Sequence, residues 1–525
     1  MTEPYLSKSK FIAGLQCPKL LWTYYNDKNA IPEPDQGTQA IFDQGHLVGE
    51  LATSLFPNGI KIDWDAGFDE VISASTKALA ERRPLFEPGF RNGLSYARAD
   101  VLNPVSGGRW DLIEVKSGTK VEDVHLQDVA FQKYVYEGAG VPIRRCYLMH
   151  IDNSYVRRGE VDAGKLFKKE DVTKQVSSIL SGIPEQVSAM RGIIGSKRCP
   201  DIKISGNCDS PYTCPLKESC WSFLPERNVF SMYRGGARKM DLFEGGIMRL
   251  ADIPDGFPLT ESQRIQVECD KSGQPHIDKE AIAGFLNGLQ YPLYFLDFET
   301  FNTAIPAYDL VRPYQQVPFQ YSLCVLRSPG TEFEGLGFLA DGIKDPRPEI
   351  LSRLKSELGK KGSIVAYNAS FEIRILTECA DYYPEYFDWV QRLLPRFADL
   401  FVPFRSFHYY HPDQLGSASL KAVMPALAAR GYDDLEIADG GTASLRFLDM
   451  AFGTVSEPER AVIRNQLEIY CAQDTSGMVD IINSLTTILH HDELRFSCER
   501  KALDAKEKDV ARNNLGLKLK EVREK

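Results

Sequence analysis

Residues 291–300 read Tyr-Pro-Leu-Tyr-Phe-Leu-Asp-Phe-Glu-Thr, an apolar run with two acidic residues close to its end. Apolar and aromatic residues in such a run are typical of a buried β-strand. Asp297 and Glu299 are two residues apart, so both side chains project from the same face of that strand. Unpaired carboxylates are costly to bury, whereas a pair that binds a divalent cation is compensated. The run therefore predicts a strand that ends in a metal site.

Two later segments carry acids in comparable places. The apolar run at 364–366 is followed by Tyr-Asn-Ala-Ser-Phe-Glu, which puts Glu372 at the opening of a helical pattern. Tyr470 and Asp474 are four residues apart and share one face of a predicted helix. Four acids can hold two divalent cations roughly 3.5–4 Å apart, which activate a water and stabilise the departing oxygen in phosphodiester hydrolysis. Tyr470 is expected to orient that water, and Asp399 either joins the site or caps a helix.

Together these motifs resemble the DnaQ-like exonucleases of the RNase H fold, in the DEDD branch whose last motif is Tyr-x-x-x-Asp. The resemblance covers about residues 291–490. The segment GSASLKAV at 416–423 resembles a stretch that packs beside the site in that class, with a structural role left open. The second motif of the class usually ends in aspartate, so Glu372 keeps the charge but changes its reach. The resemblance implies a 3′–5′ exonuclease that binds Mg²⁺ or Mn²⁺ through Asp297, Glu299, Glu372 and Asp474.

Residues 94–118, LSYARADVLNPVSGGRWDLIEVKSG, contain a second group of acids. Two runs of alternating apolar residues flank turn-forming asparagine, proline and glycine, so we expect an antiparallel hairpin. Alternation along the strand puts Glu114 and Lys116 on one face and Asp111 on the other. Asp100, near the end of the preceding strand, is expected to approach the face of Glu114. Two carboxylates for a divalent cation and one lysine for a water or a phosphate form a hydrolytic set.

The helix that follows places Gln132 and Tyr136 four residues apart on one face, where both are expected to reach a nucleotide backbone. His46 is expected either to complete the metal shell with its imidazole or to be an ordinary surface or core histidine. In order and spacing, this set resembles the PD-(D/E)XK nucleases of the RecB type, including the exonucleases associated with CRISPR adaptation, over most of residues 1–222. The resemblance implies a site made of His46, Asp100, Glu114, Lys116, Gln132 and Tyr136.

Three cysteines, Cys208, Cys214 and Cys220, are spaced evenly, and Cys17 lies far upstream. Zinc sites usually pair ligands two to four residues apart, whereas three clustered thiolates and a distant one suit a cubane iron–sulfur cluster. Buried thiols are the alternative, but Pro, Asp, Ser, Lys and Glu surround these cysteines. In the resembled nucleases, one N-terminal cysteine and three after the nuclease core hold a 4Fe-4S cluster. Zinc remains the alternative metal, and Cys199 the alternative ligand.

A chain of 525 residues is too long for one hydrophobic core, because single domains typically span roughly 100–200 residues. A hydrophobic share of 43% predicts globular domains rather than disorder. Apolar runs that alternate with helical segments in the second half indicate an α/β class. We expect a PD-(D/E)XK nuclease domain with the four-cysteine cluster at 1–222, a small helical connector at 223–290, an RNase H-like exonuclease domain at 291–490 and a charged C-terminal helix at 491–525.

The sequence also bears on the location of the protein. No apolar run approaches the roughly 20 residues needed to cross a bilayer, and the first residues lack the apolar stretch of a secretory signal. The eleven cysteines favour a reducing compartment and thiolates used as metal ligands rather than disulfides. We therefore expect a cytoplasmic protein without a membrane partner.

The net charge of −10 does not exclude nucleic acid, because divalent ions neutralise both the acids of a site and the phosphates of a substrate. The motifs predict a metal-dependent nuclease with two active sites that processes nucleic-acid ends in repair or defence, with single-stranded DNA as the expected substrate. An RNA 3′–5′ exonuclease is one alternative, since nothing in the motifs reads a 2′-hydroxyl. A nucleic-acid-binding scaffold with one or both sites inactive is another, and Glu372 keeps it open.

Overall fold

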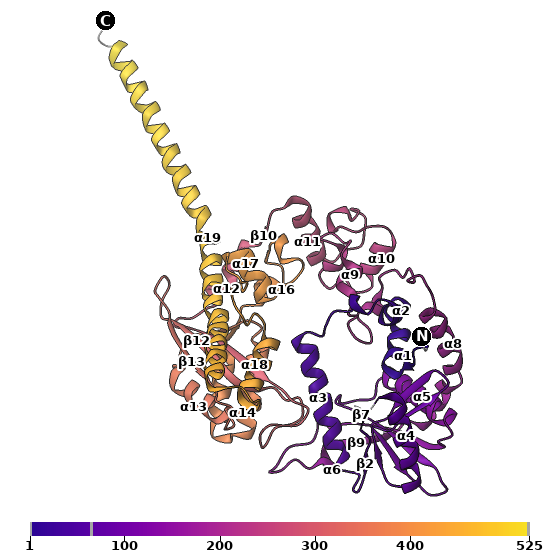
Figure 1. The fold of residues 1–525 in the computed structure, drawn as a ribbon. Coiled ribbons are helices and arrows are strands. Elements are labelled where there is room, and N and C mark those ends of the chain that lie inside the picture. Colours follow the sequence, from indigo (N-terminus) through magenta and orange to yellow (C-terminus); the bar gives the residue numbers. More distant parts are fainter. Residues whose placement is uncertain (1–2, 64–66, 522–525) are drawn as a thin grey trace. The chain divides into compact units, whose positions relative to one another are not determined.

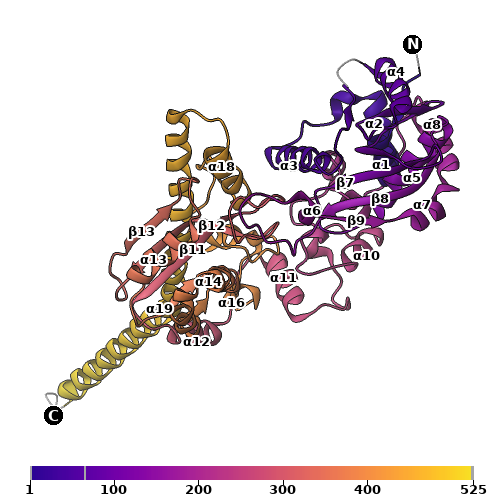
Figure 2. The same cartoon turned by 90° about the horizontal axis from the view of Figure 1, so that it is seen from below.

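The structure is a computed structural model that describes residues 3–63 and 67–521, with side chains up to residue 490. The chain forms two compact units. The first is Met1–Pro225 with Thr300–Val317, and the second is Glu226–Glu299 with Pro318–Lys525. Both units combine helices with β-sheet, which confirms the mixed α/β class (Figures 1 and 2).

In the described part of the first unit, the main sheet has six strands in the order β2-β3-β6-β7-β8-β9, and a smaller sheet has the order β1-β5-β4. Strands β6 and β7 are antiparallel, with Val101 opposite Ile113, which confirms the expected hairpin. Strands β7 and β8 are parallel. The strands are β1 Leu6–Ser7, β2 Ile60–Lys61, β3 Leu85–Phe86, β4 Gly89–Asn92, β5 Ser95–Arg98, β6 Val101–Pro104, β7 Trp110–Lys116, β8 Ile143–Ile151 and β9 Phe167–Asp171.

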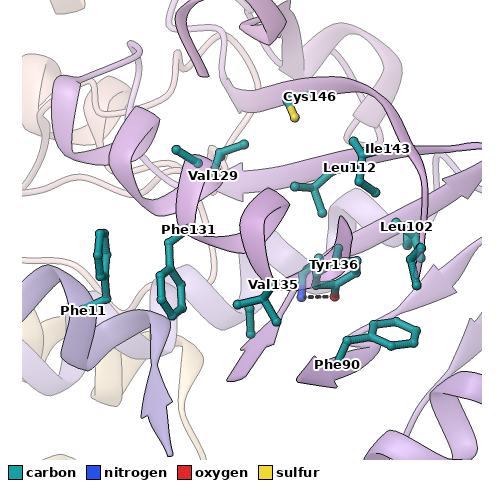
Figure 3. Close-up of a cluster of buried hydrophobic side chains, with 14 of the residues drawn as sticks. Phe11, Phe90, Leu102, Leu112, Val129, Phe131, Val135, Tyr136, Ile143 and Cys146 are labelled. Carbon is teal, nitrogen blue, oxygen red and sulfur yellow. Dashed lines mark hydrogen bonds between the residues drawn. The ribbon is translucent and has the colours of Figure 1, made fainter. Parts of the chain in front are cut away.

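Helix α5 (Asp123–Gly138) forms the crossover that two parallel neighbours such as β7 and β8 require. It packs on the face of β7 that carries Leu112, and its side chains fill the main core of the unit (Figure 3). Phe131 of α5 stacks on Phe11 of helix α1 (Lys8–Gln16), with ring centroids 4.5 Å apart. This packing ties the N-terminal helix to the centre of the sheet.

The other face of β7 is covered by helix α3 (Gln36–Thr53), because Val48 and Ala52 pack against Ile113 and Val115. The two faces of β7 therefore serve two separate cores. The remaining α-helices of the first unit are α2 Pro18–Asn26, α4 Phe68–Ala78, α6 Ala163–Leu166, α7 Thr173–Leu180, α8 Ile183–Ile194 and α9 Lys217–Trp221.

Residues 300–317 belong to the first unit although they follow a strand of the second. The Arg157 guanidinium donates to the carbonyl oxygens of Pro306, at 2.8 Å, and Ala307, at 2.7 Å. The Tyr314 hydroxyl donates to the carbonyl oxygen of Ser117. The expected boundary at residue 291 therefore does not separate the two units in this stretch.

In the described part of the second unit, the main sheet has five strands in the order β13-β12-β11-β14-β15, and a two-stranded sheet pairs β10 with β16. Strand β14 is parallel to both β11 and β15. Apolar residues of β11 at positions 294, 296 and 298 face a core shared with α13 and α14. The strands are β10 His276–Ile277, β11 Leu293–Phe301, β12 Val317–Leu326, β13 Glu334–Leu339, β14 Ile364–Ala366, β15 Phe397–Asp399 and β16 Tyr409–Tyr410.

The expected connector at 223–290 is part of the second unit from residue 226 onward. Its helices enclose a small core of their own around Leu242 and Val267. Its β10 pairs with β16, and Arg227 forms an ion pair of 2.6 Å with Asp413. These contacts explain why the segment groups with the later chain. Its α-helices are α10 Arg238–Glu244, α11 Glu261–Ser272 and α12 Lys279–Asn287.

The last helix, α19 (Glu457–Glu521), is continuous over 65 residues. Residues 491–521, expected as a separate C-terminal helix, extend the helix that carries Tyr470 and Asp474. The other α-helices of the second unit are α13 Arg347–Glu357, α14 Ser370–Tyr382, α15 Phe387–Leu393, α16 Val402–Arg405, α17 Leu420–Ala428 and α18 Gly440–Phe452. Short 3-10 helices of the chain are Lys28–Ala30, Leu79–Glu81, Gly206–Cys208, Val229–Ser231, Leu250–Asp252, Pro384–Tyr386, Leu394–Arg396 and Pro412–Gln414.

Within the described residues, no helix has the length and apolar character that a bilayer crossing requires.

Candidate active sites

The second unit gathers acids at the end of β11. Asp297 and Glu299 lie on one face of this strand, opposite the face that packs on the core, as the two-residue spacing predicts. The Glu299 side chain is buried, and Asp297 is half-buried. Strand β14 runs parallel to β11 and leads into α14, which carries Glu372 in its first turn. Tyr470 and Asp474 come from α19, and both are buried.

The charges of these acids act on one another. Burial raises the pKa of Asp297 well above its usual value, and the charges of Asp474, Glu299 and Glu372 raise it further. Burial also raises the pKa of Glu299 to about 8, with Asp474 as the largest charge contribution. Mutual repulsion of this kind requires carboxylates at short range. The structure therefore brings together the four acids that three separate motifs contribute.

Glu372 is 3% exposed, and its Oε2 atom has no hydrogen-bond partner within the described chain. Burial raises its pKa to about 8, and the charge of Asp399 acts in the same direction. A buried carboxylate oxygen without a donor is costly unless a cation binds it. Glu372 therefore fits a metal ligand better than a structural residue.

Two further side chains act on Asp474. The Tyr432 hydroxyl donates to Asp474 Oδ1, and the ammonium of Lys421 lies 5.5 Å from the ring centres of both Tyr432 and Tyr470. Burial raises the pKa of Asp474 to about 6, while the Tyr432 bond and the Lys421 charge oppose the rise. Lys421 lies in the GSASLKAV segment noted above, whereas Tyr432 stands in a loop that no motif marks.

Beside these residues lies a cavity of about 330 Å³. Lys421 and Tyr432 line it, so it opens next to the groups that hold Asp474. It is lined by Lys421, Pro425, Gly431, Tyr432, Asp433, Leu435 and Ala438.

A thiol joins the acids. Cys471 is fully buried, and its Sγ donates to Asp297 Oδ2 at 3.8 Å. One ligand atom each from Asp297, Glu299 and Cys471 lies within 4.8 Å of the others. Sequence spacing did not mark Cys471, although it follows Tyr470 directly. The grouping places possible metal ligands on β11 and α19 at the distances that a single ion needs.

Asp399 has a different role from the four acids. Its Oδ1 accepts hydrogen bonds from the backbone amides of Asn368 (3.0 Å), Ala369 (3.2 Å) and Phe401 (3.1 Å). These amides begin α14 and the turn before α16. These contacts fit the expected role of Asp399 as a helix cap rather than a place among the four acids. Because it caps α14, Asp399 positions Glu372.

In the first unit, Asp100 and Glu114 approach each other across the β6–β7 hairpin. Asp100 Oδ2 accepts a hydrogen bond of 2.6 Å from the Val115 amide, next to Glu114. The Lys116 ammonium lies 2.8 Å from Glu114 Oε1 and 2.8 Å from Asp128 Oδ2. Burial raises the pKa of Asp100 and of Glu114. The charges of acidic neighbours raise both pKa values further. The expected shared face of Glu114 and Lys116 is confirmed.

Helix α5 brings Gln132 to the acids of the expected site, whereas Tyr136 lies outside it. Gln132 is fully buried, so the expectation that it reaches a nucleotide backbone is wrong. Gln132 Nε2 donates to Glu114 Oε2 at 2.8 Å and to Asp128 Oδ1 at 3.0 Å. Tyr136 is fully buried in the main core, where its hydroxyl donates to the Pro88 carbonyl and accepts from the Ala99 amide at 2.9 Å (Figure 3). The expectation that Tyr136 reaches a nucleotide backbone is therefore wrong, because α5 turns this side chain into the protein.

His46 also lies away from this group. It is exposed on α3, the helix that packs on Ile113 and Val115, on the face of β7 opposite Glu114. Within the described chain, no hydrogen bond or ion pair joins His46 to Asp100 or Glu114. The exposure of His46 fits the surface alternative, and a role as a metal ligand stays a prediction.

Two residues of the first site were missed from the sequence. Lys8 at the start of α1 places its ammonium 2.7 Å from Glu114 Oε1. Asp128 is buried and contacts Lys116 and Gln132. Asp128 precedes Gln132 by one helical turn, a spacing that marks a shared face. Lys8 is 106 positions from Glu114, and no local pattern announces it.

The four cysteines expected as ligands gather at the N-terminal helices. Cys17 and Cys220 pack with Cys214 around Ala13 and Leu20. Burial raises the pKa of the Cys214 thiol, and the charges of Cys17, Cys208 and Cys220 raise it further. The Cys214 amide also donates to the Cys208 carbonyl at 2.8 Å. The ten described cysteines are free thiols.

Cys199 lies in the same neighbourhood. Burial raises the pKa of its thiol, and the charges of Cys17 and Cys220 contribute. Within the described residues, no three of the four expected thiols lie within 4.8 Å of one another.

Comparisons with known proteins cover parts of the chain. A family model described as "Domain of unknown function (DUF2779)" matches residues 294–419, a stretch that includes Asp297, Glu299 and Glu372 but neither Tyr470 nor Asp474. The chain is 26% identical over 234 residues to the uncharacterized protein UU173 of Ureaplasma parvum serovar 3. This match covers 40% of the chain and 33% of the relative, so the chain spans about a third of that relative's length.

One solved structure is similar in part. The crystal structure of a protein named SSO0001 matches with a TM-score of 0.23 and 10% identity, and the match covers 43% of this chain and 89% of that one. A similarity at this level carries no argument about the fold or the function.

Proposed function

We propose that the protein is a metal-dependent nuclease, and that its second unit hydrolyses phosphodiester bonds with divalent cations held by Asp297, Glu299, Glu372 and Asp474. One observation carries the proposal. These four carboxylates converge, three of the four are buried, and Lys421 is the side-chain cation whose charge reaches both Glu299 and Asp474. Such an excess of negative charge is stable only with a bound cation or a proton.

The chemistry of the donor set fits Mg²⁺ or Mn²⁺. Hard divalent cations prefer carboxylate oxygens, and Glu372 Oε2 is a buried oxygen without another partner in the described chain. When bound, two such cations supply a nucleophilic water at neutral pH and stabilise the leaving oxygen. Zinc would suit Cys471 better than magnesium does, because thiolates are softer ligands.

The residues of the chain itself then have separate tasks. The Tyr470 hydroxyl orients the attacking water, and Tyr432 fixes the rotamer of Asp474 through its hydrogen bond. The Lys421 ammonium lies next to the cavity and offers a positive charge to a substrate phosphate. The cavity beside it has room for part of a nucleotide. We infer cleavage from a 3′ end, in line with the resemblance to DnaQ-like enzymes of the RNase H fold.

We also propose that the first unit is a nuclease of the PD-(D/E)XK kind, with Asp100 and Glu114 as metal ligands and Lys116 as the cation that acts on the water or the phosphate. Gln132 supports this set, because it donates to Glu114 Oε2. Cys17, Cys208, Cys214 and Cys220 are proposed to hold a 4Fe-4S cluster that joins the N-terminal helices to the segment after the nuclease core. The gathering of the thiols supports a shared metal group, because Cys17, Cys214 and Cys220 pack in one cluster and the charge of Cys208 reaches Cys214.

Digestion of end-labelled nucleic acid tests the proposal. Single-stranded DNA and RNA, labelled at the 3′ or the 5′ end, are incubated with Mn²⁺ or Mg²⁺ and wild type, Lys116→Ala or Asp297→Ala. Two product ladders, each lost in one variant, are expected. Loss of all products in both variants would contradict two independent sites, and preference for RNA would select the RNA exonuclease alternative.

A nucleic-acid-binding scaffold is the alternative that the departure at Glu372 favours. Glu372→Asp distinguishes the two, because it restores the residue usual in the resembled class. Cleavage by the wild type that Glu372→Asp leaves equal or raises supports a working site. Wild-type protein that binds labelled single strands but cleaves none of them under any metal condition would support the scaffold.

A further inference from the structure

In the first site, two lysine ammonium groups contact the same carboxylate oxygen. Glu114 Oε1 lies 2.7 Å from the Lys8 ammonium and 2.8 Å from the Lys116 ammonium. The Glu114 side chain is 2% exposed, whereas Lys8 is 28% exposed. Lys116 is also held by Asp128 at 2.8 Å, but Lys8 has Glu114 as its one ion-pair partner within 4.0 Å in the described chain.

The two sites of the protein therefore differ in charge balance. In the first, Asp100, Glu114 and Asp128 face two lysine ammonium groups. Burial lowers the pKa of Lys8, but the charges of Asp128, Glu114 and Asp100 outweigh burial and raise it above its usual value, so Lys8 stays charged. In the second site, four acids are balanced only in part by Lys421.

We propose that Lys8 is a positioning residue that competes with divalent cations for Glu114. Its ammonium holds the carboxylate in the metal-free protein and withdraws to the exposed side when a cation binds. The first unit then requires a higher metal concentration than the second. This inference rests on the proposed metal-binding role of Asp100 and Glu114.

The competition follows from geometry and charge. A carboxylate oxygen that already accepts two ammonium groups has little capacity left for a cation. Two like charges held near one oxygen also repel each other strongly in a partly buried setting. Lys8 is the partner that can leave, because it is attached at the first residue of α1 and is partly exposed.

Manganese binding tests this inference. Full-length protein with Asp297→Asn and Glu299→Gln, which remove acids of the second site, is titrated with Mn²⁺ and followed by electron paramagnetic resonance. We expect Lys8→Met to lower the dissociation constant of the first unit at least about ten-fold. Lys8→Arg keeps the charge, so its dissociation constant for Mn²⁺ is expected to stay close to that of the protein with Lys8. Lys10→Met removes a lysine of the same helix that lies over the Tyr24 ring, and should leave the constant unchanged.

The outcomes separate the inference from the proposed function. Equal manganese affinity with Lys8 and with Lys8→Met overturns the competition and leaves the metal role of Glu114 intact. Manganese binding by neither protein overturns both. Lys8→Gln is measured in parallel, and a folded circular dichroism spectrum with unchanged affinity in both variants is decisive against the inference.

Discussion

Glu299→Gln is expected to make the metal-free protein more stable. A glutamate in the unfolded chain releases its proton near pH 4.5, whereas burial and the charge of Asp474 keep the proton on Glu299 up to about pH 8. Between these values the folded state binds more protons than the unfolded state, so stability falls as pH rises from 4.5 to about 8. Glutamine cannot titrate and avoids this loss.

The size of the effect follows from the same values. At pH 7 the loss extends over 2.5 pH units, from 4.5 to 7, and each unit corresponds to about 1.4 kcal/mol, so the total is about 3.5 kcal/mol. Below pH 4.5 the difference between wild type and variant disappears. For a folding unit of more than 150 residues, this corresponds to a rise in Tm of roughly 7 °C.

Thermal unfolding in EDTA, followed by circular dichroism at pH 4.5 and pH 7, measures this difference. Saturating Mn²⁺ should raise the Tm of the wild type at pH 7 and raise that of the variant less, because the variant lacks one ligand charge. Glu349→Gln is the matched control, because its exposed pair with Arg353 contributes at most about 1 kcal/mol. A metal-free Glu299→Gln protein that is less stable than wild type at pH 7 would show that ionised Glu299 does not destabilise the fold.

Three further substitutions test the expected roles of Tyr470, Tyr136 and the clustered cysteines. Tyr470→Phe removes the hydroxyl proposed to orient the water. It should lower kcat of the proposed 3′ exonuclease about 10- to 100-fold with unchanged Mn²⁺ affinity, and a loss of Mn²⁺ binding would contradict that role. Tyr136→Phe leaves the buried Ala99 amide without a partner and should lower the free energy of unfolding of the first unit by about 1–3 kcal/mol. The kcat of the folded protein should stay at the wild-type value. A large drop in kcat would restore the expected catalytic role of Tyr136. Cys214→Ser should remove iron from anaerobically purified protein, as measured by elemental analysis, whereas Cys146→Ser, in the buried core, should not. Zinc in place of iron in the wild type would contradict the iron–sulfur cluster but leave the four cysteines as metal ligands.

Local spacing predicted the parts of the sites that lie on one element. Two-residue spacing placed Asp297 with Glu299 and Glu114 with Lys116, because alternation along a strand does not depend on the rest of the fold. The β6–β7 hairpin followed from its turn residues for the same reason. The roles of these residues in catalysis stay predictions.

Spacing failed where the environment of an element decides. Gln132 and Tyr136 share a helix face, but periodicity does not tell how far a face is buried, and Tyr136 lies in the core. Lys8 and Tyr432 reach their acids from distant segments, a relation that only the tertiary fold creates. Residues 300–317 join the first unit through backbone carbonyls, which carry no sequence signal.

The acids of β11, α14 and α19 are proposed to bind divalent cations. Crystals of the full chain soaked in Mn²⁺ and measured near the manganese absorption edge test this proposal directly. Two anomalous peaks roughly 3.5–4 Å apart are expected among Asp297, Glu299, Glu372 and Asp474, and Glu299→Gln is expected to remove one or both of them. The absence of any peak at these carboxylates in a manganese-soaked crystal would contradict it.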